Sequence, residues 1–381
     1  MKNILLGTSV LVGAAALFAG AANADTPKVT LGGTAEFQAG FVSEDLDTTT
    51  RSGAFRTENE INVNVDGKTD AGLGYGAMIN LEASATNDGD NTSDQTPHNY
   101  VYLDGAWGRI QGGSDIGVTN TMKVDASKIA RATGGIDGDY NYFFTAPNSA
   151  FVIGTPDLAL DYGTYGAAGF GDESQENINK ISYYTPRFAG FQAGVSYLFS
   201  NIAGNTGTGV VRTDTGTGQE NIILGAVNYE GKFSDVGVKL GATGEHGNSQ
   251  TAGFEDLRTW QVGAEVDYMG FSLAGSYADF DDSLRSAADS AAGYDDNNFW
   301  TLGAAYETGP YGVSVTYMKS NYEVAAGDNE FTNLSVGADY KLAPGLTPYA
   351  EVSFVEVDGA GTGTTQDNEG TVFIAGTSLS F

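Results

Sequence analysis

Apolar and polar residues alternate with a period of two along most of the chain. In the segment 29–41, every second residue is apolar or small, and the residues between them include Thr34, Glu36 and Gln38. The segments 54–65 and 260–268 show the same alternation, whereas a helical period is nearly absent. A period of two is typical of strands with one apolar and one polar face. The pattern therefore predicts an all-β protein.

Short and long connections alternate between the predicted strands. Seven short connections each contain glycine: 66–72, 105–108, 186–190, 230–235, 269–270, 307–310 and 342–345. Tight turns use glycine because it adopts positive φ angles readily. Eight longer polar stretches separate the strand pairs: 44–53, 88–97, 116–178, 201–219, 245–256, 280–296, 323–330 and 359–368. The fifteen connections imply sixteen strands, with both chain ends on the side of the short turns.

The predicted strands have the length and polarity of strands that cross a membrane. Each is about ten residues long, which spans a bilayer when the strand is tilted by about 45°. Aromatic residues such as Phe188, Phe191, Tyr268 and Phe271 flank the short turns, as an interfacial girdle would require. The preference of aromatic residues for strands does not explain this position. The sequence predicts a transmembrane antiparallel up-and-down β-barrel with a polar lumen.

The first residues have the layout of a secretory signal peptide. Lys2 precedes an apolar stretch, and Ala22-Asn23-Ala24 forms a small-residue cleavage site. We expect residues 1–24 to be removed after Sec-type export across the inner membrane, leaving the barrel domain 25–381. An uncleaved membrane anchor is the rival interpretation. The chain has no cysteine, so strand pairing must hold the exported fold together.

Three segments resemble the Gram-negative general porins. They are ISYYTPRFAGFQAGVSYLF (181–199), VYLDGAWGRIQGGSD (101–115) and YKLAPGLTPYAEVSF (340–354), together with the terminal Phe381. The resemblance implies a sixteen-stranded barrel in the cell outer membrane. It also implies a homotrimer, and a third external loop that folds into the lumen. Outer-membrane lipid and lipopolysaccharide would then be its surroundings.

The third external loop, 116–178, is the longest connection and is longer than the family usually needs. Within it, 149–163 could form a hairpin around 154–157. If that hairpin joined the wall, the barrel would have eighteen strands. The segment 119–132 could form a short amphipathic helix. A loop of this length without its own structure is uncommon unless it has a function, so we expect it to constrict the pore.

Charges divide between this loop and the barrel wall. The loop carries three bases, Lys123, Lys128 and Arg131, and eight acids: Asp125, Asp137, Asp139, Asp157, Asp161, Asp172, Glu173 and Glu176. We expect Asp125, Asp137 and Asp139 on the acidic side of the constriction. The lumen-facing bases Arg56, Arg109, Lys180 and Lys239 would form the opposite side. A transverse field would orient polar solutes; ordinary solvated charges are the alternative.

The last strand must close the barrel. In 371–381, Phe373, Leu379 and Phe381 fall on one face, which we assign to lipid. An unpaired edge in lipid would leave backbone groups without partners, so this strand is expected to pair with the first. The resemblance implies that the barrel-assembly machinery recognises the terminal aromatic residue.

Other chemistry has little support in the sequence. His98 and His246 are the only histidines, and no G-x-S-x-G motif occurs, so we expect neither a zinc site nor an enzyme. Acids on external loops, including Asp281, Asp282, Asp295 and Asp296, could bind Ca²⁺ or Mg²⁺ loosely and bridge to lipopolysaccharide phosphates. Ordinary solvated acids are the simpler interpretation. No other cofactor is expected.

Net charge decides between classes of partner. The chain has a formal charge of −30, which disfavours nucleic-acid binding. Strand charges must point into the lumen, where acids outnumber bases, so we expect a cation-preferring channel for passive diffusion of small hydrophilic solutes. The alternative is a barrel with a restricted lumen whose loops act as adhesin, receptor or surface-layer component.

Overall fold

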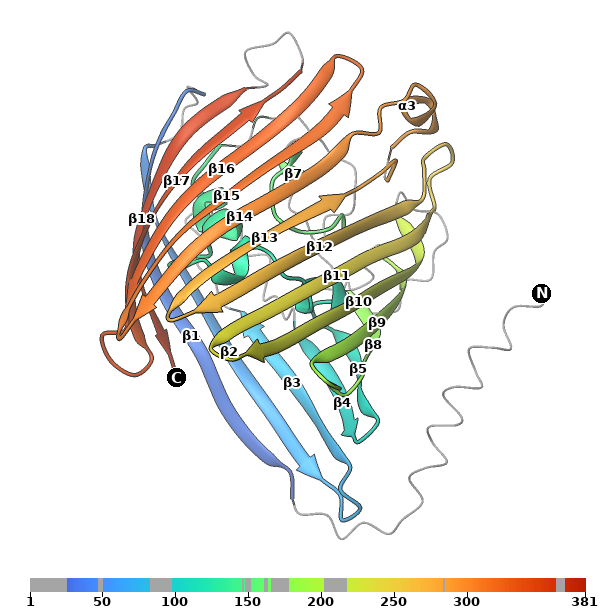
Figure 1. Ribbon diagram of the computed structural model, residues 1–381, viewed down its shortest axis with the longest axis vertical. Coiled ribbons are helices and arrows are strands. Elements are labelled where there is room, and N and C mark those ends of the chain that lie inside the picture. Colours follow the sequence, from blue (N-terminus) through green and yellow to red (C-terminus); the bar gives the residue numbers. More distant parts are fainter. Residues whose placement is uncertain are drawn as a thin grey trace, which may run out of the picture.

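Sixteen strands form one closed antiparallel barrel, shown in Figure 1. The structure is a computed structural model that describes residues 26–46, 51–82, 98–145, 147, 152–160, 164–165, 178–201, 218–283, 285–360 and 367–381. The predicted signal peptide lies outside these residues. The wall strands are β1 (Lys28–Glu44), β2 (Gly53–Lys68), β3 (Gly74–Glu82), β4 (Asn99–Gly105), β5 (Gly108–Ser114), β8 (Asn179–Tyr184), β9 (Phe191–Ser200), β10 (Gln219–Phe233), β11 (Val236–Ser249), β12 (Leu257–Tyr268), β13 (Phe271–Asp279), β14 (Asn297–Thr308), β15 (Tyr311–Val324), β16 (Gly327–Tyr340), β17 (Leu346–Asp358) and β18 (Asn368–Ser380).

The last strand closes the barrel against the first, as predicted. β18 pairs with β1 in a register that aligns Ser380 with Thr34. Beyond the strand, the backbone N–H of Phe381 donates to the carbonyl of Gly33, and the N–H of Gly33 donates back, each at 3.0 Å. Phe373, Leu379 and Phe381 are all exposed on the outer surface. The seam therefore leaves no open edge between the first and last strands.

All seven short connections occur where the sequence predicts them. The predicted long loop at 323–330 is wrong. β15 continues to Val324 and β16 begins at Gly327, so two residues join them. Gly327 has φ +134°, which a tight turn accommodates only with glycine. On the outer face of the extended strands, Lys319 and Glu330 form a 2.9 Å ion pair, so polar residues there belong to strands and not to a loop.

The two faces of the wall differ in polarity. On β12, the side chains of Thr259, Gln261 and Glu265 are buried inside the barrel, whereas Trp260 and Val262 are exposed outside. Aromatic pairs cluster beside the short turns: Phe191 with Tyr229, Phe271 with Tyr306, and Tyr311 with Tyr340, with ring centroids 4.3–4.9 Å apart. The outer surface is thus apolar with an aromatic girdle, as expected. No helix of the described residues is long and apolar enough to span a membrane.

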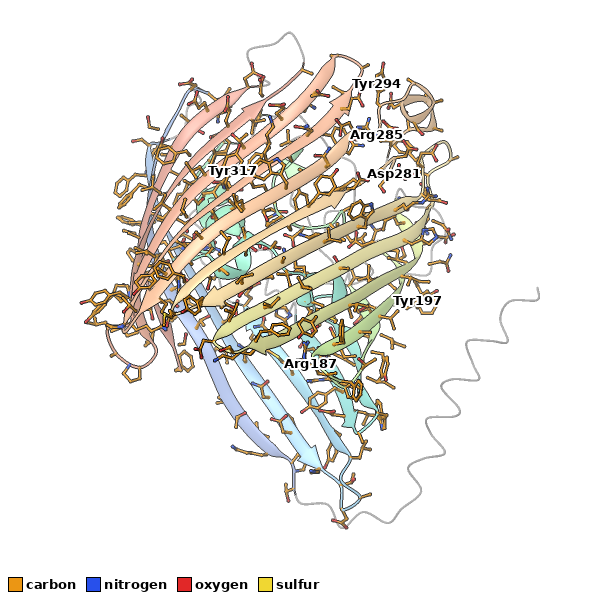
Figure 2. All side chains as sticks on the ribbon, viewed as in Figure 1. Arg187, Tyr197, Asp281, Arg285, Tyr294 and Tyr317 are labelled. Carbon is orange, nitrogen blue, oxygen red and sulfur yellow. The ribbon has the colours of Figure 1, made fainter. Side chains whose placement is uncertain are left out.

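Apart from the two-residue turn between β15 and β16, the described connections at the opposite end are longer and carry polar residues. Figure 2 shows the side chains of Asp281, Arg285 and Tyr294 around the connection between β13 and β14, which contains α3 (Ala287–Ala291). Arg187 marks the opposite end, in the short connection between β8 and β9. The predicted connection at 245–256 is shorter than expected, because β11 continues to Ser249.

The connection between β5 and β8 folds into the barrel, where Figure 1 shows its coiled segments. It contains α2 (Val118–Thr121), three 3-10 turns, η2 (Ala126–Ile129), η3 (Gly135–Asp137) and η4 (Asp139–Tyr142), and the short strands β6 (Val152–Ile153) and β7 (Thr164–Tyr165). We call it the inner loop.

Two predictions about the inner loop need correction. The expected helix at 119–132 is broken, because Asp125 caps η2 by accepting from the N–H of Ser127 and so starts a new turn. A hairpin does exist, but its second strand lies at 164–165, beyond the expected 149–163, and β6 and β7 form a separate two-stranded sheet and not part of the wall. The hydroxyl of Ser320 donates to the carbonyl of Ile153 at 2.7 Å, which fastens β6 to the inside of β15. The eighteen-stranded alternative is therefore wrong.

Candidate functional site

The inner loop lies against one side of the barrel interior. Its helical segments contact strands from β9 round to β18. Backbone N–H groups of the loop donate to wall hydroxyls: Val118 to Ser196 (3.3 Å), Ala126 to Thr301 (3.2 Å) and Ile136 to Thr316 (3.2 Å). The wall carboxylate of Glu351 accepts from the Thr133 hydroxyl at 2.7 Å and from the Gly135 N–H at 3.1 Å. The loop thus narrows the lumen, and its η4 segment reaches Arg56 on β2.

A buried charge cluster holds two parts of the inner loop together. The Lys123 ammonium lies 3.2 Å from Asp125, forms an ion pair with Asp157, and donates to the carbonyl of Pro156 at 3.1 Å. Its side chain is 1% exposed. Burial alone would lower the pKa of Lys123, but the carboxylates, Asp125 above all, raise it well above the ordinary value. The cluster therefore joins the segment around η2 to the segment that follows β6.

Asp137 lies at the edge of this cluster. Its carboxylate is 3.9 Å from the Lys123 ammonium, and its side chain keeps 32% of its surface exposed. Desolvation and then repulsion by Asp157 raise the pKa of Asp137 to about 7, although Lys123 opposes the shift. Asp125 differs, because Lys123 and Lys128 overcome the effect of burial and hold its pKa below the ordinary value. Neither acid faces a wall base, so both act within the loop.

Asp139 is the predicted loop acid that meets a predicted wall base. Its carboxylate lies 3.3 Å from the Arg56 guanidinium, which also pairs with Glu58 at 2.7 Å. Arg56 stacks 3.8 Å over the ring centre of Tyr142, and Gln38 donates to Asp139. Burial raises the pKa of Asp139 to about 6, against the opposing effects of Gln38 and Arg56. At this point a loop acid, Asp139, faces a wall base, Arg56, as expected.

In the described part of the chain, the other three predicted bases contact groups other than the loop acids that the sequence suggested. Lys239 pairs with Glu265 of the neighbouring strand at 2.6 Å. Lys180 donates to the carbonyl of Asp115, and Arg109 stacks 3.8 Å over Tyr102. The four other loop acids that the sequence suggested, Asp161, Asp172, Glu173 and Glu176, lie outside the described residues.

One contact reverses the expected arrangement of charges, because it pairs a loop base with wall acids. Arg131 of the inner loop forms an ion pair with the wall residue Glu307 and lies 3.7 Å from Asp339. Strand alternation places Asp339 on the inner face, but no sequence signal indicates that Arg131 reaches it. The loop therefore brings a base to an acidic wall here, as well as an acid to a basic wall at Arg56.

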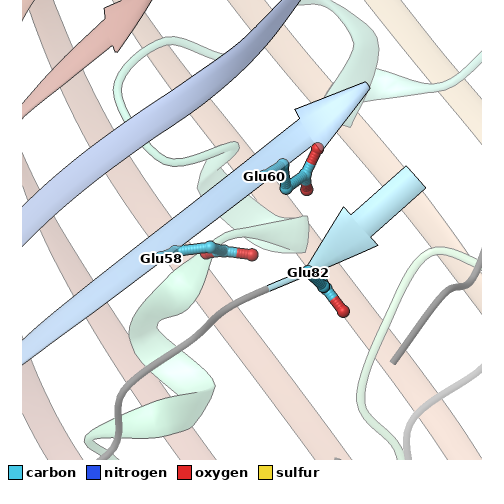
Figure 3. Close-up of side chains that lie close together, drawn as sticks. All are labelled: Glu58, Glu60 and Glu82. Carbon is cyan, nitrogen blue, oxygen red and sulfur yellow. The ribbon is translucent and has the colours of Figure 1, made fainter. Parts of the chain in front are cut away.

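Three wall carboxylates converge opposite the inner loop. One carboxylate oxygen from each of Glu58, Glu60 and Glu82 lies within 4.8 Å of the other two, and Figure 3 shows the three side chains. Glu60 and Glu82 are direct partners across β2 and β3, and Glu58 lies two residues along β2. Glu58 and Glu60 line a cavity of about 370 Å³ together with Asp139 and Asp339. Alternation predicts that each glutamate faces inward, but only the register brings them together.

The predicted divalent sites on external connections show no comparable grouping in the described residues. Asp281 pairs with Arg258 at 3.5 Å, and the backbone N–H groups of Asp295 and Asp296 donate to Glu323. The buried Oδ1 of Asp282 has no hydrogen-bond partner among the described residues. Loose cation binding by these four acids stays a prediction.

Residues 8–360 match the family model described as Gram-negative porin. The chain belongs to the Gram-negative porin family. It is 26% identical to an uncharacterized protein of Rickettsia bellii over 450 residues, covering all of both chains, and 26% identical to one of Rickettsia prowazekii over 461 residues. Two mutants of the Rh. blastica porin share its fold, with a TM-score of 0.57 and 17% and 16% identity, covering 93% of this chain and all of theirs.

Family and fold together define the general activity of this porin. They place it in the outer membrane as a channel for small solutes, in a family of channels that are not enzymes. The closed barrel, the apolar outer surface and the polar interior provide the physical basis for passage across lipid.

Proposed function

We propose that this porin is a water-filled, cation-preferring channel through which small hydrophilic solutes and ions diffuse passively. The observation that carries the proposal is the group Glu58, Glu60 and Glu82 on the wall opposite the inner loop. Three carboxylates at this spacing create a strongly negative potential. A lumen with low-dielectric walls focuses that potential and raises the local concentration of cations.

Arg56 offsets part of this charge, since it pairs with Glu58 at 2.7 Å, and two of the three carboxylates lie outside that pair. Arg56, Lys123, Arg131 and Lys239 each lie within 4 Å of at least one carboxylate. A base that is paired in this way adds little net positive potential at a distance. Carboxylates outside these pairs, such as Asp104 and Asp235, add to the negative side, since both line cavities of the interior. The balance therefore favours cations.

The zero-current potential across a planar bilayer under a potassium chloride gradient tests the proposal. We expect the sign of a cation-selective channel, and a weaker preference in the triple variant Glu58→Gln, Glu60→Gln, Glu82→Gln. Glu356→Gln, on the exposed outer face of β17, is the matched control and should leave the potential unchanged. An anion-selective wild type would refute the preference. A barrel that inserts but carries no current would favour the adhesin or receptor alternative.

We also propose that the mature porin begins at Asp25 after Sec-type export and assembles as a homotrimer. Small residues on the outer face of β1, Gly33, Ala35 and Ala39, leave room for close packing of a neighbouring barrel. The apolar surface around them includes Phe37 and Phe55, whose rings stack 5.5 Å apart. Chemical cross-linking in outer-membrane fractions and mass spectrometry of the mature N-terminus test these two points.

A further inference from the structure

A second cavity lies away from the glutamate group, on the inner face of β4, β5, β8, β9 and β10. Its volume is about 670 Å³, and Thr121 and Met122 of the inner loop form part of its boundary. Binding pockets for small molecules commonly span about 300–1,000 Å³. The lining relevant to binding consists of Asp104, Arg109, Gln111, Tyr184, Gln192 and Asn228.

Arg109 presents a fixed cation to this cavity. Its guanidinium stacks 3.8 Å over the ring centre of Tyr102, and the Tyr102 hydroxyl donates to Asp66, which fixes the ring. No carboxylate lies within ion-pair distance of Arg109 in the described part of the chain, and its buried Nε has no hydrogen-bond partner there. A planar guanidinium held in this way matches the geometry of a carboxylate.

Acceptor groups line the same cavity. Asp104 is the register partner of Arg109 across β4 and β5, yet the two form no ion pair, because Arg109 turns toward Tyr102. Asn228 is 8% exposed, and its side-chain oxygen has no donor among the described residues. These two groups suit an ammonium group, which only donates hydrogen bonds.

The other charged side chains of the cavity already have side-chain partners. Arg187 pairs with Glu230 at 3.3 Å. Asp115 accepts from Gln111 and lies 2.8 Å from the His98 ring nitrogen. Among the described residues, Arg109 and Asp104 are the charged lining side chains without an ion pair or a side-chain hydrogen bond, so they can face a solute.

We propose that this cavity is a binding subsite for small zwitterions, such as amino acids and dipeptides. The carboxylate of the solute binds Arg109, and its ammonium group binds Asp104, the register partner of Arg109. The inference rests on the proposed channel function, since the subsite lies along the lumen. Binding is weak and reversible, because a solute must leave the channel as readily as it enters.

Glycylglycine as an added solute in planar-bilayer recordings tests the subsite. We expect a reversible, concentration-dependent reduction of the potassium current through the wild type. Arg109→Gln should weaken the apparent affinity by about tenfold or more, because a charge-assisted contact is lost. Asp104→Asn should weaken binding of glycylglycine but not of N-acetylglycine, which lacks the ammonium group. Arg258→Gln, an exposed arginine outside the lumen, is the control and should behave as wild type.

The outcomes separate this inference from the proposed function. If the wild type conducts but glycylglycine does not change its current, the subsite proposal is refuted and the channel proposal is unaffected. Equal block in the Arg109→Gln and Arg258→Gln variants also overturns it. Equal affinity for N-acetylglycine overturns the assignment to zwitterions. If the barrel carries no current, the channel proposal fails, and calorimetric titration of the detergent-solubilised protein with glycylglycine decides the subsite alone.

Discussion

The carbonyl oxygen of Val124 occupies the space that a β-carbon on Gly263 would need. Gly263 faces inward on β12, between the buried side chains of Gln261 and Glu265. A second wall glycine, Gly337, would bring its β-carbon within 2.7 Å of the carbonyl oxygen of Arg131. Contacts this close are possible only because the wall residues have no side chain. The position of the inner loop, and hence the width of the lumen, depends on these two glycine contacts.

We expect Gly263→Ala to push the inner loop toward the lumen. Single-channel conductance should fall, and overpacking should lower the free energy of unfolding by about 1–3 kcal/mol. Gly225→Ala is the matched control, because nothing lies within 4 Å of the added carbon there. Bilayer recordings and urea unfolding measure the two effects. Conductance equal to that of the control would show that the contact between Gly263 and Val124 does not set the width of the lumen.

The sequence predicts the wall of this porin far better than its interior. Strand faces and short turns follow from local rules, because alternation and glycine positions concern neighbouring residues. The contacts of the inner loop are not local: Lys123 meets Asp157, and Arg56 meets Asp139. The loop has no regular alternation of apolar and polar residues from which its conformation could be predicted. Even in the wall, the polar segment 323–330 wrongly predicts a loop. Polar side chains belong to the extended strands there, where Lys319 and Glu330 form an ion pair across β15 and β16.

Lys123→Met should loosen the inner loop. The variant leaves the carboxylates of Asp125, Asp137 and Asp157 close together without their cation. Removing one partner of a buried charge group commonly costs about 3–5 kcal/mol. We expect increased open-channel current noise and easier proteolysis within the loop. Lys68→Met is the control, since Lys68 is exposed at the end of β2, and equal noise in both variants would contradict the proposed anchoring role.

Deletion of Phe381 should impair assembly more than stability. It removes the two backbone hydrogen bonds to Gly33, each worth about 0.5–1.5 kcal/mol net, and an exposed ring. We expect the assembly machinery to recognise the last strand before the barrel closes, so outer-membrane yield should fall sharply. Phe381→Ala keeps the backbone bonds and isolates the contribution of the ring, and Phe188→Ala tests another exposed aromatic residue. Normal yield of both Phe381 variants at high expression would refute the role.

Cation preference should weaken as the pH falls. A carboxyl group is negative above its pKa and neutral below it. The pKa values of Asp137 and Asp139 are about 7 and about 6, so both groups lose their charge within the range from about pH 8 to about pH 5. Protonation of Asp139 leaves the positive charge of Arg56, 3.3 Å away, without that carboxylate, so the lumen becomes less negative at this point.

The zero-current potential under a potassium chloride gradient measures this change. We expect Asp139→Asn to remove the part of the change near pH 6, and Asp137→Asn the part near pH 7. Asp358→Asn, at the exposed outer end of β17, should keep the wild-type profile. The side chain of Asp137 is more exposed than that of Asp139, so its pKa should respond more to salt concentration. A preference that is constant across this range in the wild type would show that neither carboxylate contributes to selectivity.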